Sequence, residues 1–337
     1  MCAKIVVANR IHDSVEQQLR VAGELTVNTD ETPWDLASLT RHCSDAFALM
    51  AFMTERIDGA FLDACPGLKI IAGALKGYNN IDVAACTDRG VAVTVVPDLL
   101  TEPTAELTLG LIISVMRNLG AGDRLLRSGA FNGWRPTLYG SSLNGSTVGI
   151  LGAGAVGQAT LRMLGGFDCE RLYYDPVRLA PEIEERLGAT CVSEEVLVRD
   201  SDVLVLAVHL KPDNRHLVND AYIRRMKPGA FLINPARGSL VDEAAVADAL
   251  ESGHLSGYAA DTFELEDWQL SDRPRGVDPR LLASDKTVFT PHVGSGVRTV
   301  REAIEAEAAH NILDMLAGVR PRGLVNPAVW SAESNKA

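Results

Sequence analysis

The stretch that decides the fold reads Thr147-Val148-Gly149-Ile150-Leu151-Gly152-Ala153-Gly154-Ala155-Val156-Gly157. Its apolar run, residues 148–151, predicts a buried strand, and a helical pattern resumes directly after the glycines. In such a Gly-x-Gly-x-x-Gly turn the glycines allow a tight turn, close approach of a pyrophosphate, and close packing of helix on strand. The helix start adds unpaired N–H groups and a positive dipole end for that anion.

The residues after this turn favour a dinucleotide site. A second short strand, 171–175, ends in Asp175, roughly 20 residues on, where an acid holds the adenosine ribose hydroxyls. Asp175 is expected to repel a ribose 2′-phosphate and so to favour NAD over NADP, although Arg178 is close enough to weaken that preference. The alternative is a structural strand–helix–strand unit that binds no nucleotide.

Size and composition exclude several classes of protein. The 337 residues give room for two domains, and a hydrophobic content of 47% supports substantial cores. The net charge of −12 argues against a nucleic-acid partner, and no apolar run approaches the ~20 residues of a membrane span. The chain enters a strand at once, so we expect no cleavable signal and a cytoplasmic location. Six scattered cysteines indicate reduced thiols and no metal site.

Two regions alternate short apolar runs with helical patterns, which predicts parallel strands with crossover helices. In the first region we expect strands at 4–8, 46–52, 68–75 and 91–96, with helices at 13–22, 35–43, 58–64 and 82–89. A long helix, 102–128, and a loop or arm, 128–144, separate it from the second region. There the strands after the glycine motif are expected at 171–175, 202–208, 229–236, 257–263 and 287–291.

A last long helix is expected over 298–317, and its most economical use is to cross back to the first domain. The predicted fold class is therefore α/β, with two doubly wound parallel-sheet domains of the Rossmann/flavodoxin-like kind and the substrate cleft between them. Residues 1–100 plus 295–337 would form a discontinuous substrate (lid) domain. Residues 101–294 would form the NAD-binding domain.

Three polar residues follow predicted strand ends, where doubly wound sheets bind their ligands: Arg237, Glu266 and His292. A guanidinium holds a negatively charged substrate. Histidine accepts a proton as hydride leaves for NAD⁺, and a neighbouring carboxylate orients the ring. Taken singly, the arginine could cap a turn, the glutamate could be a solvated acid, and the histidine could be structural.

Four motifs in this order resemble the D-2-hydroxyacid dehydrogenase family over nearly the whole chain: Gly152-x-Gly154-x-x-Gly157, Asn234-Pro-Ala-Arg237-Gly238, Asp261-Thr-Phe263-x-x-Glu266 and Pro291-His292. The resemblance implies catalytic roles for Arg237, Glu266 and His292, and a contact from Asp261 to the nicotinamide amide. The cofactor-binding residues expected with it are Gly152, Gly154, Ala155, Val156, Gly157, Asp175, Thr104, Ala207, Val208, Pro235, Asp261 and Gly294.

The departures from the general family pattern point to one branch. Asp267-Trp268 stands where the family usually has proline, the 74–82 loop carries Lys76, and Met50-Ala-Phe-Met53 follows a strand. These features resemble the phosphite (phosphonate) dehydrogenases. That resemblance implies oxidation of phosphite to phosphate with NAD, His292 taking a proton from the attacking water, and a homodimer. The substrate-binding residues expected with it are Lys76, Met53, Gly77, Arg301, Trp134 and Tyr139.

Charge supports this branch independently, because phosphite can carry two negative charges and a 2-hydroxy acid carries one. A second cation, Lys76 beside Arg237, suits the higher charge, and Arg301 would add a third. Each of these residues also has a non-functional interpretation. Lys76 could be a surface lysine in a loop, and Arg301 could be an ordinary helix-surface arginine. Trp134 and Tyr139 could be packing residues of a dimer arm. Two other functions stay open: a hydroxyacid dehydrogenase reducing a 2-keto acid such as glyoxylate, and a dinucleotide-sensing protein without turnover.

Overall fold

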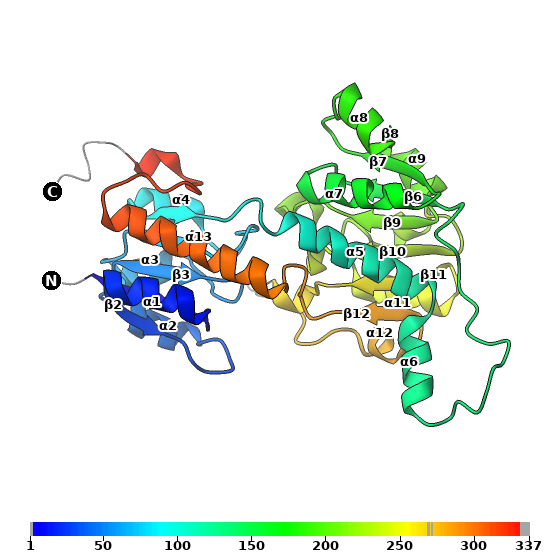
Figure 1. The fold of residues 1–337 in the computed structure, drawn as a ribbon, viewed down its shortest axis with the longest axis horizontal. Coiled ribbons are helices and arrows are strands. Elements are labelled where there is room, and N and C mark those ends of the chain that lie inside the picture. Colours follow the sequence, from blue (N-terminus) through cyan, green and yellow to red (C-terminus); the bar gives the residue numbers. More distant parts are fainter. Residues whose placement is uncertain (1–2, 268–269, 271, 331–337) are drawn as a thin grey trace. The chain divides into compact units, whose positions relative to one another are not determined.

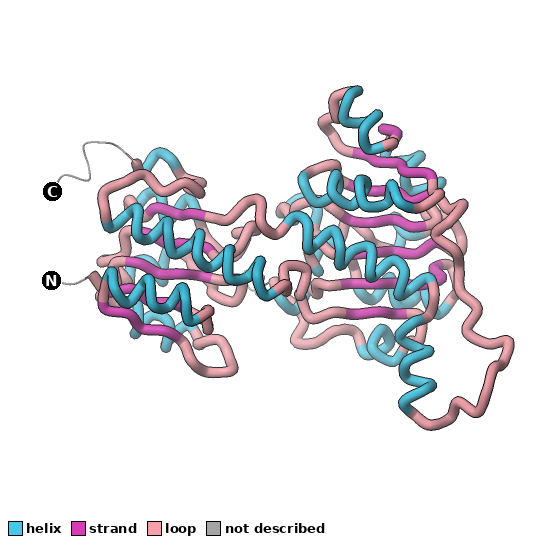
Figure 2. The backbone as a smooth tube through the Cα atoms, in the orientation of Figure 1, coloured by secondary structure: helices cyan, strands magenta, loops and turns pink. Residues whose placement is uncertain are grey.

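The computed structural model describes residues 3–267, 270 and 272–330, so Trp268 lies outside the described residues. The chain divides into two compact units. Unit 1 comprises Met1–Leu100, Trp268–Ser271 and Val297–Ala337, and unit 2 comprises Thr101–Asp267 and Asp272–Gly296. Each unit contains one parallel sheet with helices packed against it (Figures 1 and 2). The predicted α/β class with two parallel sheets is confirmed.

Unit 1 holds a five-stranded parallel sheet in the order β2-β1-β3-β4-β5, the flavodoxin-like order. Its strands are β1 (Lys4–Val7), β2 (Glu24–Val27), β3 (Ala48–Ala51), β4 (Ile70–Gly73) and β5 (Ala92–Thr94). Its helices are α1 (Asp13–Ala22), α2 (Leu36–Cys43), α3 (Gly59–Ala64), α4 (Val83–Asp88), α13 (Arg298–Leu316) and the short η5 (Pro327–Val329). Strands β3, β4 and β5 are buried along their whole length, as their continuous apolar runs predict.

The long helix α13 belongs to the core of unit 1. Ile304, Ala308 and Ile312 are fully buried in the same cluster as the strand residues of β1 and β3. Figure 1 shows α13 lying beside α1 along the sheet. The C-terminal part of the chain therefore completes a core that the first hundred residues begin.

Unit 2 holds a seven-stranded parallel sheet in the order β12-β11-β10-β9-β6-β7-β8. Its strands are β6 (Thr147–Leu151), β7 (Glu170–Tyr174), β8 (Thr190–Cys191), β9 (Val203–Leu206), β10 (Ala230–Asn234), β11 (Leu255–Ala260) and β12 (Thr287–Phe289). Its α-helices are α5 (Thr101–Met116), α6 (Leu119–Arg127), α7 (Ala155–Met163), α8 (Pro181–Leu187), α9 (Glu194–Asp200), α10 (Asp220–Ile223), α11 (Glu243–Glu251) and α12 (Pro279–Ala283). Short helical turns are η1 (Leu164–Gly166), η2 (Pro212–Asn214), η3 (Gly238–Leu240) and η4 (Glu264–Glu266). The strand order reverses between β6 and β9, next to the glycine motif.

The structure corrects the single helix predicted over residues 102–128. Asn118 has a φ of 53°, a left-handed conformation that a continuing α-helix does not contain, so the segment divides into α5 and α6. Helix α5 is buried against the sheet of unit 2. Helix α6 and the loop after it extend away from that sheet (Figure 1).

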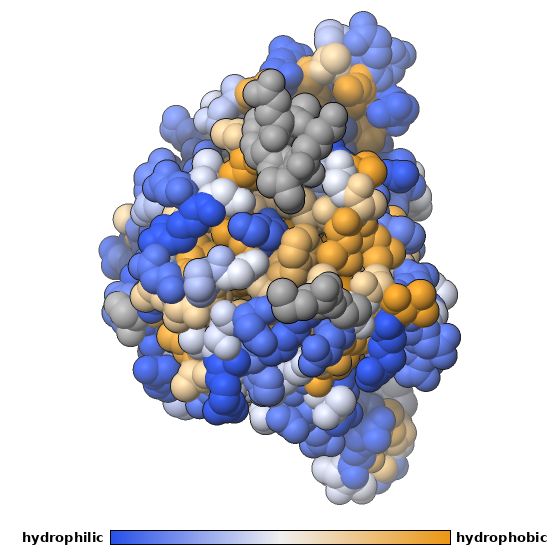
Figure 3. Space-filling view, turned by 90° about the vertical axis from the view of Figure 1, so that its left-hand side faces the viewer, coloured by the Kyte–Doolittle hydropathy of each residue, from blue (hydrophilic) through white to orange (hydrophobic). Residues whose placement is uncertain are grey.

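No helix among the described residues combines the length and the apolar content that a membrane crossing requires. The face seen in Figure 3 is mostly hydrophilic, with hydrophobic residues in small groups between polar ones. The five described cysteines are free thiols.

Candidate active site

The three predicted catalytic residues lie at one edge of the unit 2 sheet. Arg237 comes shortly after β10, Glu266 is in η4 after β11, and His292 follows β12. Strands β10, β11 and β12 are parallel neighbours, so their carboxyl ends share this edge. The parallel sheet therefore brings these three residues, which are far apart in the sequence, close together in space.

His292 and Glu266 form a direct pair. The His292 Nδ1 atom lies 2.5 Å from Glu266 Oε2, and Glu266 Oε1 accepts a 2.7 Å hydrogen bond from the Phe263 N–H. The backbone of His292 has a φ of 53°, and its N–H donates to the Asp261 carbonyl at 2.8 Å. A non-glycine residue held in this left-handed conformation is a feature that concentrates at functional sites.

Arg237 is half-buried on a turn that Asn234 holds in place. The Asn234 side chain donates to the Arg237 carbonyl at 2.8 Å and accepts from the Ala236 N–H at 3.1 Å. Arg237 Nη1 donates to the Ala236 carbonyl at 2.7 Å. Burial lowers the pKa of Arg237, while Asp267 and Glu266 act in the opposite direction. A guanidinium nevertheless stays charged at neutral pH, so the turn presents a fixed cation.

Gly238 keeps the loop of Arg237 against the loop of Glu266. A Cβ atom at this position would lie only 1.8 Å from the Phe263 carbonyl carbon and 2.0 Å from the Glu264 nitrogen. Only glycine leaves room for this contact between the two loops. The packing of η3 on η4 therefore sets the spacing between the arginine and the glutamate.

Asp267 is a neighbour of this site for which no role was predicted. It is buried, and its carboxylate accepts hydrogen bonds from the Ser239 N–H, at 3.1 Å, and from the Ser239 hydroxyl. Burial raises the pKa of Asp267, and the bonds from Ser239 and the charge of Arg237 counteract part of that rise. The only sequence feature that could have pointed to Asp267 is its position, because the family usually has proline there.

Asp261 is fixed at the same edge by three donors. Its Oδ1 accepts from the Thr290 hydroxyl at 2.6 Å and from the Val293 N–H at 2.8 Å, and its Oδ2 accepts from the Gly294 N–H at 2.8 Å. Burial raises the pKa of Asp261, and the hydrogen bond from Thr290 opposes that rise. A Cβ at Gly294 would lie 3.2 Å from Thr104 Oγ1, so Thr104 also belongs to this neighbourhood.

The glycine turn has the shape that a dinucleotide requires. A Cβ at Gly154 would meet no atom within 4 Å, which leaves space outside the start of α7. A Cβ at Gly157 would lie 2.1 Å from the Gly152 carbonyl oxygen, so the helix packs closely on the turn. The first turn of α7, with Ala155 and Val156, directs its N–H groups outward at Gly154.

The remaining predicted cofactor residues surround this turn or the same sheet edge. The Ala207 carbonyl oxygen and the Val208 side chain lie 2.5 and 2.9 Å from a Cβ position on Gly152. Asp175 Oδ2 accepts a 2.8 Å hydrogen bond from the Ala153 N–H, and Pro235 is buried directly after β10. The described residues therefore fit NAD(P), with a pyrophosphate at α7 and a ribose near β7.

Unit 1 brings together a separate group of predicted substrate residues. Lys76, Gly77, Met53 and Arg301 are each half-buried. The Arg301 guanidinium donates to the Ala74 carbonyl at 3.4 Å, two residues before Lys76, and lies 5.9 Å from the centre of the Phe52 ring. Burial lowers the pKa of Lys76, opposed by Asp98, and burial also lowers the pKa of Arg301, opposed by Glu305.

Trp134 and Tyr139 do not join the histidine–glutamate pair of their own chain. Their side chains are 77% and 74% exposed. The Tyr139 carbonyl accepts from Asn118, two residues beyond the end of α5, whereas Thr104 lies in the first turn of that helix. A 16-residue helix is about 24 Å long, so it separates the two ends. The two aromatic residues are exposed on the arm after α6.

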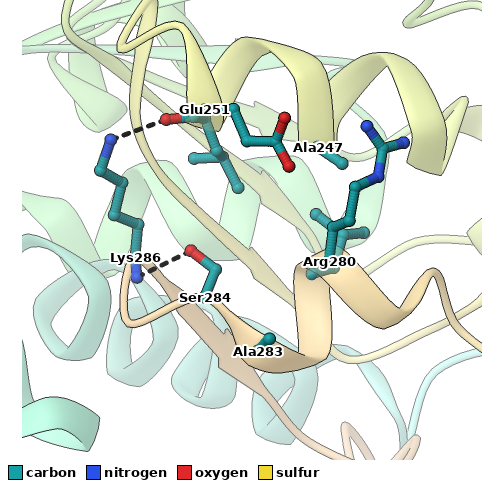
Figure 4. Close-up of a pocket in the computed structure, with 8 residues that line it drawn as sticks. Ala247, Glu251, Arg280, Ala283, Ser284 and Lys286 are labelled. Carbon is teal, nitrogen blue, oxygen red and sulfur yellow. Dashed lines mark hydrogen bonds between the residues drawn. The ribbon is translucent and has the colours of Figure 1, made fainter.

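Unit 2 also contains a pocket of about 390 Å³ at the opposite, amino-terminal edge of β12 (Figure 4). It is lined by Ala247, Leu250, Glu251, Arg280, Leu281, Ala283, Ser284 and Lys286. Its cations are engaged: Lys286 donates to the Leu250 carbonyl at 2.7 Å, and Arg280 pairs with Asp278 and Asp248. This pocket is therefore unrelated to the residues at the carboxyl edge.

The chain is also similar in sequence to known proteins. A model of the D-isomer specific 2-hydroxyacid dehydrogenase NAD binding domain matches residues 109–294. A glyoxylate reductase of Thermococcus onnurineus is 35% identical over 334 residues, which is 98% of this chain and 97% of that protein.

Two solved structures extend the comparison to the fold. A D-isomer specific 2-hydroxyacid dehydrogenase from Polaromonas sp. JS6 66 is similar with a TM-score of 0.88 and 30% identity, over 96% of this chain and 100% of that one. An NADPH-dependent glyoxylate/hydroxypyruvate reductase from Sinorhizobium meliloti, in complex with NADP and malonate, has a TM-score of 0.83 and 28% identity, over 98% of each chain.

Proposed function

Since this chain belongs to the D-2-hydroxyacid dehydrogenase family, we propose that Arg237, Glu266 and His292 carry its chemistry. The family makes the chain an NAD(P)-dependent oxidoreductase. The observation that carries the proposal is the 2.5 Å contact between His292 Nδ1 and Glu266 Oε2. Because Glu266 holds Nδ1, the other ring nitrogen, Nε2, is the atom that exchanges a proton with the reacting group.

The other residues have binding and orienting roles in this proposal. Arg237 holds the substrate anion, and Asp261 holds the carboxamide of the nicotinamide ring. The cofactor, when bound, supplies the acceptor for a hydride. The helix start at Gly154 and Ala155 binds the pyrophosphate, and Asp175 binds the ribose hydroxyls.

For the substrate we propose phosphite. In this reaction the phosphorus loses its hydrogen as hydride, a water oxygen bonds to phosphorus to give phosphate, and the released water proton goes to His292 Nε2. The support is charge: Lys76 and Arg301 are two half-buried cations of unit 1, and Arg301 donates to the carbonyl of Ala74, two residues before Lys76. Acting on the same substrate as Arg237, they would offset the two negative charges of phosphite. Met53 and Gly77 would complete the binding surface.

A 2-keto acid such as glyoxylate is the second candidate, and the names of the relatives favour it. The T. onnurineus and S. meliloti proteins are both called reductases of glyoxylate. The same arginine, glutamate and histidine would serve that reaction in the opposite direction, with His292 donating a proton to the keto oxygen. The two candidate substrates differ in charge, and only phosphite calls for Lys76 and Arg301 as additional cations at the substrate.

A substrate panel decides between them. We expect NADH absorbance to rise when the protein is mixed with NAD⁺ and phosphite, and we expect slower oxidation of NADH with glyoxylate. Vigorous glyoxylate reduction without any phosphite oxidation would reject phosphite and leave the keto acid. Binding of NADH without turnover of either substrate would instead indicate a dinucleotide-sensing protein.

We also propose a role for each of the two units and the formation of a homodimer. We propose that unit 2 binds NAD, that unit 1 contributes substrate contacts, and that the aromatic arm packs on a second copy. The support is that the arm exposes three aromatic residues, Phe131, Trp134 and Tyr139, to solvent by 51%, 77% and 74%.

A further inference from the structure

The end of β7 carries two charged residues of opposite sign that bear on cofactor choice. Asp175 follows the strand directly, and Arg178 comes three residues later. An acid here hydrogen-bonds the ribose 2′-hydroxyl of NAD, whereas an arginine nearby accommodates the 2′-phosphate of NADP. The sequence alone therefore leaves the preference open, and the contacts of Arg178 decide what it can do.

Arg178 is engaged by a carboxylate from α8. Its Nε donates to Glu184 Oε1 at 2.9 Å and its Nη2 donates to Glu184 Oε2 at 2.8 Å, so the contact is bidentate. Glu184 is itself well buried, with its side chain 12% exposed, while that of Arg178 is 68% exposed. Bidentate pairs fix the direction of a guanidinium as well as neutralising its charge.

The glutamate is also held by a residue from the core of unit 2. The Tyr173 hydroxyl donates to Glu184 Oε1 at 2.6 Å and accepts from the Leu179 N–H at 2.9 Å. The ring of Tyr173 is fully buried. The hydrogen bonds from Arg178 and Tyr173 lower the pKa of Glu184 to about 2, so this carboxylate is charged throughout the neutral range.

Among the residues that the structure describes, no cation pairs with the carboxylate of Asp175. Its Oδ2 accepts from the Ala153 N–H at 2.8 Å and its Oδ1 from the Val177 N–H at 2.9 Å, so the loop between β7 and α8 positions the carboxylate. The two charges near β7 are thus treated differently. Backbone N–H groups position Asp175, whereas Arg178 is paired with Glu184 of α8.

We propose that Glu184 is a specificity-determining residue for the cofactor. It neutralises Arg178 and holds the guanidinium toward α8, which prevents Arg178 from acting as the counter-ion of a ribose 2′-phosphate. Asp175 then acts alone at the ribose, and NAD is preferred. The proposal rests on the NAD(P)-binding domain of the family and is independent of the substrate.

The test is the binding of reduced cofactors to three full-length variants, followed by the fluorescence of the dihydronicotinamide. Glu184→Gln removes the charge and keeps an acceptor for Tyr173. We expect it to tighten NADPH binding about 10-fold, the value of one charge-assisted contact, and to leave NADH binding within twofold. Glu185→Gln is the matched control, because Glu185 is an exposed neighbour in α8 with the same charge, and it should change neither affinity.

The double variant Arg178→Ala/Glu184→Gln restores the net charge of the wild type and should restore its discrimination between the two cofactors. It also serves if Glu184→Gln alone does not fold, which a thermal melt would show. The proposal is overturned if Glu184→Gln tightens NADPH no more than Glu185→Gln does, if the gain persists without Arg178, or if the double variant binds NADPH more weakly than wild type. Absence of NADH binding to wild type would instead overturn the cofactor assignment itself.

Discussion

Among single residues, Glu266 has a proposed role that depends on the histidine ring it contacts. Glu266→Gln keeps the acceptor for the Phe263 N–H but removes the negative charge beside His292 Nδ1. We expect kcat to fall about 100-fold, because an imidazole without that charge is a poorer base and is less firmly oriented. Binding of NADH, measured by fluorescence, should not change.

The matched control for this change is Glu251→Gln, at the exposed end of α11. It removes the same charge from unit 2 and should leave kcat within twofold. Equal losses in the two variants would show that Glu266 contributes only net charge to the domain.

Lys76 gives a prediction for pH dependence. Burial lowers its pKa below that of an ordinary lysine, so the ammonium is present at low pH and is lost earlier as pH rises. We expect kcat/KM for phosphite to fall on the alkaline side. Lys76→Arg should move that fall to higher pH, because a guanidinium keeps its proton. The exposed Lys69→Arg is the control, and an unchanged profile in Lys76→Arg would exclude Lys76 from substrate binding.

The placement of a site residue could be predicted where a motif defines its position, but not where packing defines it. Arg237, Glu266 and His292 stand in motifs at strand ends, and the sheet brings them to one edge. Glu184 could not be identified, because its role depends on the packing of Tyr173 and α8 rather than on a pattern. The roles of Lys76 and Met53 stay predictions.

At the scale of elements, apolar runs predicted the central strands and the edge strands β5 and β12, but not the other two edge strands, β2 and β8. Strand β2 is half-exposed and β8 has two residues, so neither shows a continuous apolar run. The break between α5 and α6 was missed because the residues on both sides have helical patterns. Only the backbone conformation of Asn118, held by its contacts to the arm, interrupts them.

The contact between η3 and η4 is the element-scale feature with the sharpest test. Gly238→Ala would place a Cβ within 1.8 Å of the Phe263 backbone, so the two loops would have to separate. We expect the free energy of unfolding in urea to fall by about 3 kcal/mol, the range for overpacking, together with a loss of activity. Gly276→Ala is the control, because its Cβ would meet nothing within 4 Å. Equal stability of the two variants would contradict this account.

For the whole molecule, the aromatic arm predicts self-association. We expect a homodimer in sedimentation velocity, and a monomer for the double variant Trp134→Asp/Tyr139→Asp, because both side chains are largely exposed in one chain. The control is Val319→Asp, which charges another exposed apolar residue, in unit 1. A wild-type monomer, or a dimer that survives the double variant, would reject the arm as the contact.

The return of α13 to the core of unit 1 has a consequence for biosynthesis. Ile304, Ala308 and Ile312 fill a core whose strands leave the ribosome first. Unit 2 ends at Gly296, before α13 begins. When synthesis reaches residue 296, all strands of the unit 2 sheet have been made, but the unit 1 sheet still lacks the helix that completes its core. Nascent chains stalled after residue 296 should therefore resist protease in the central segment and be cleaved in the first hundred residues, which mature only at termination.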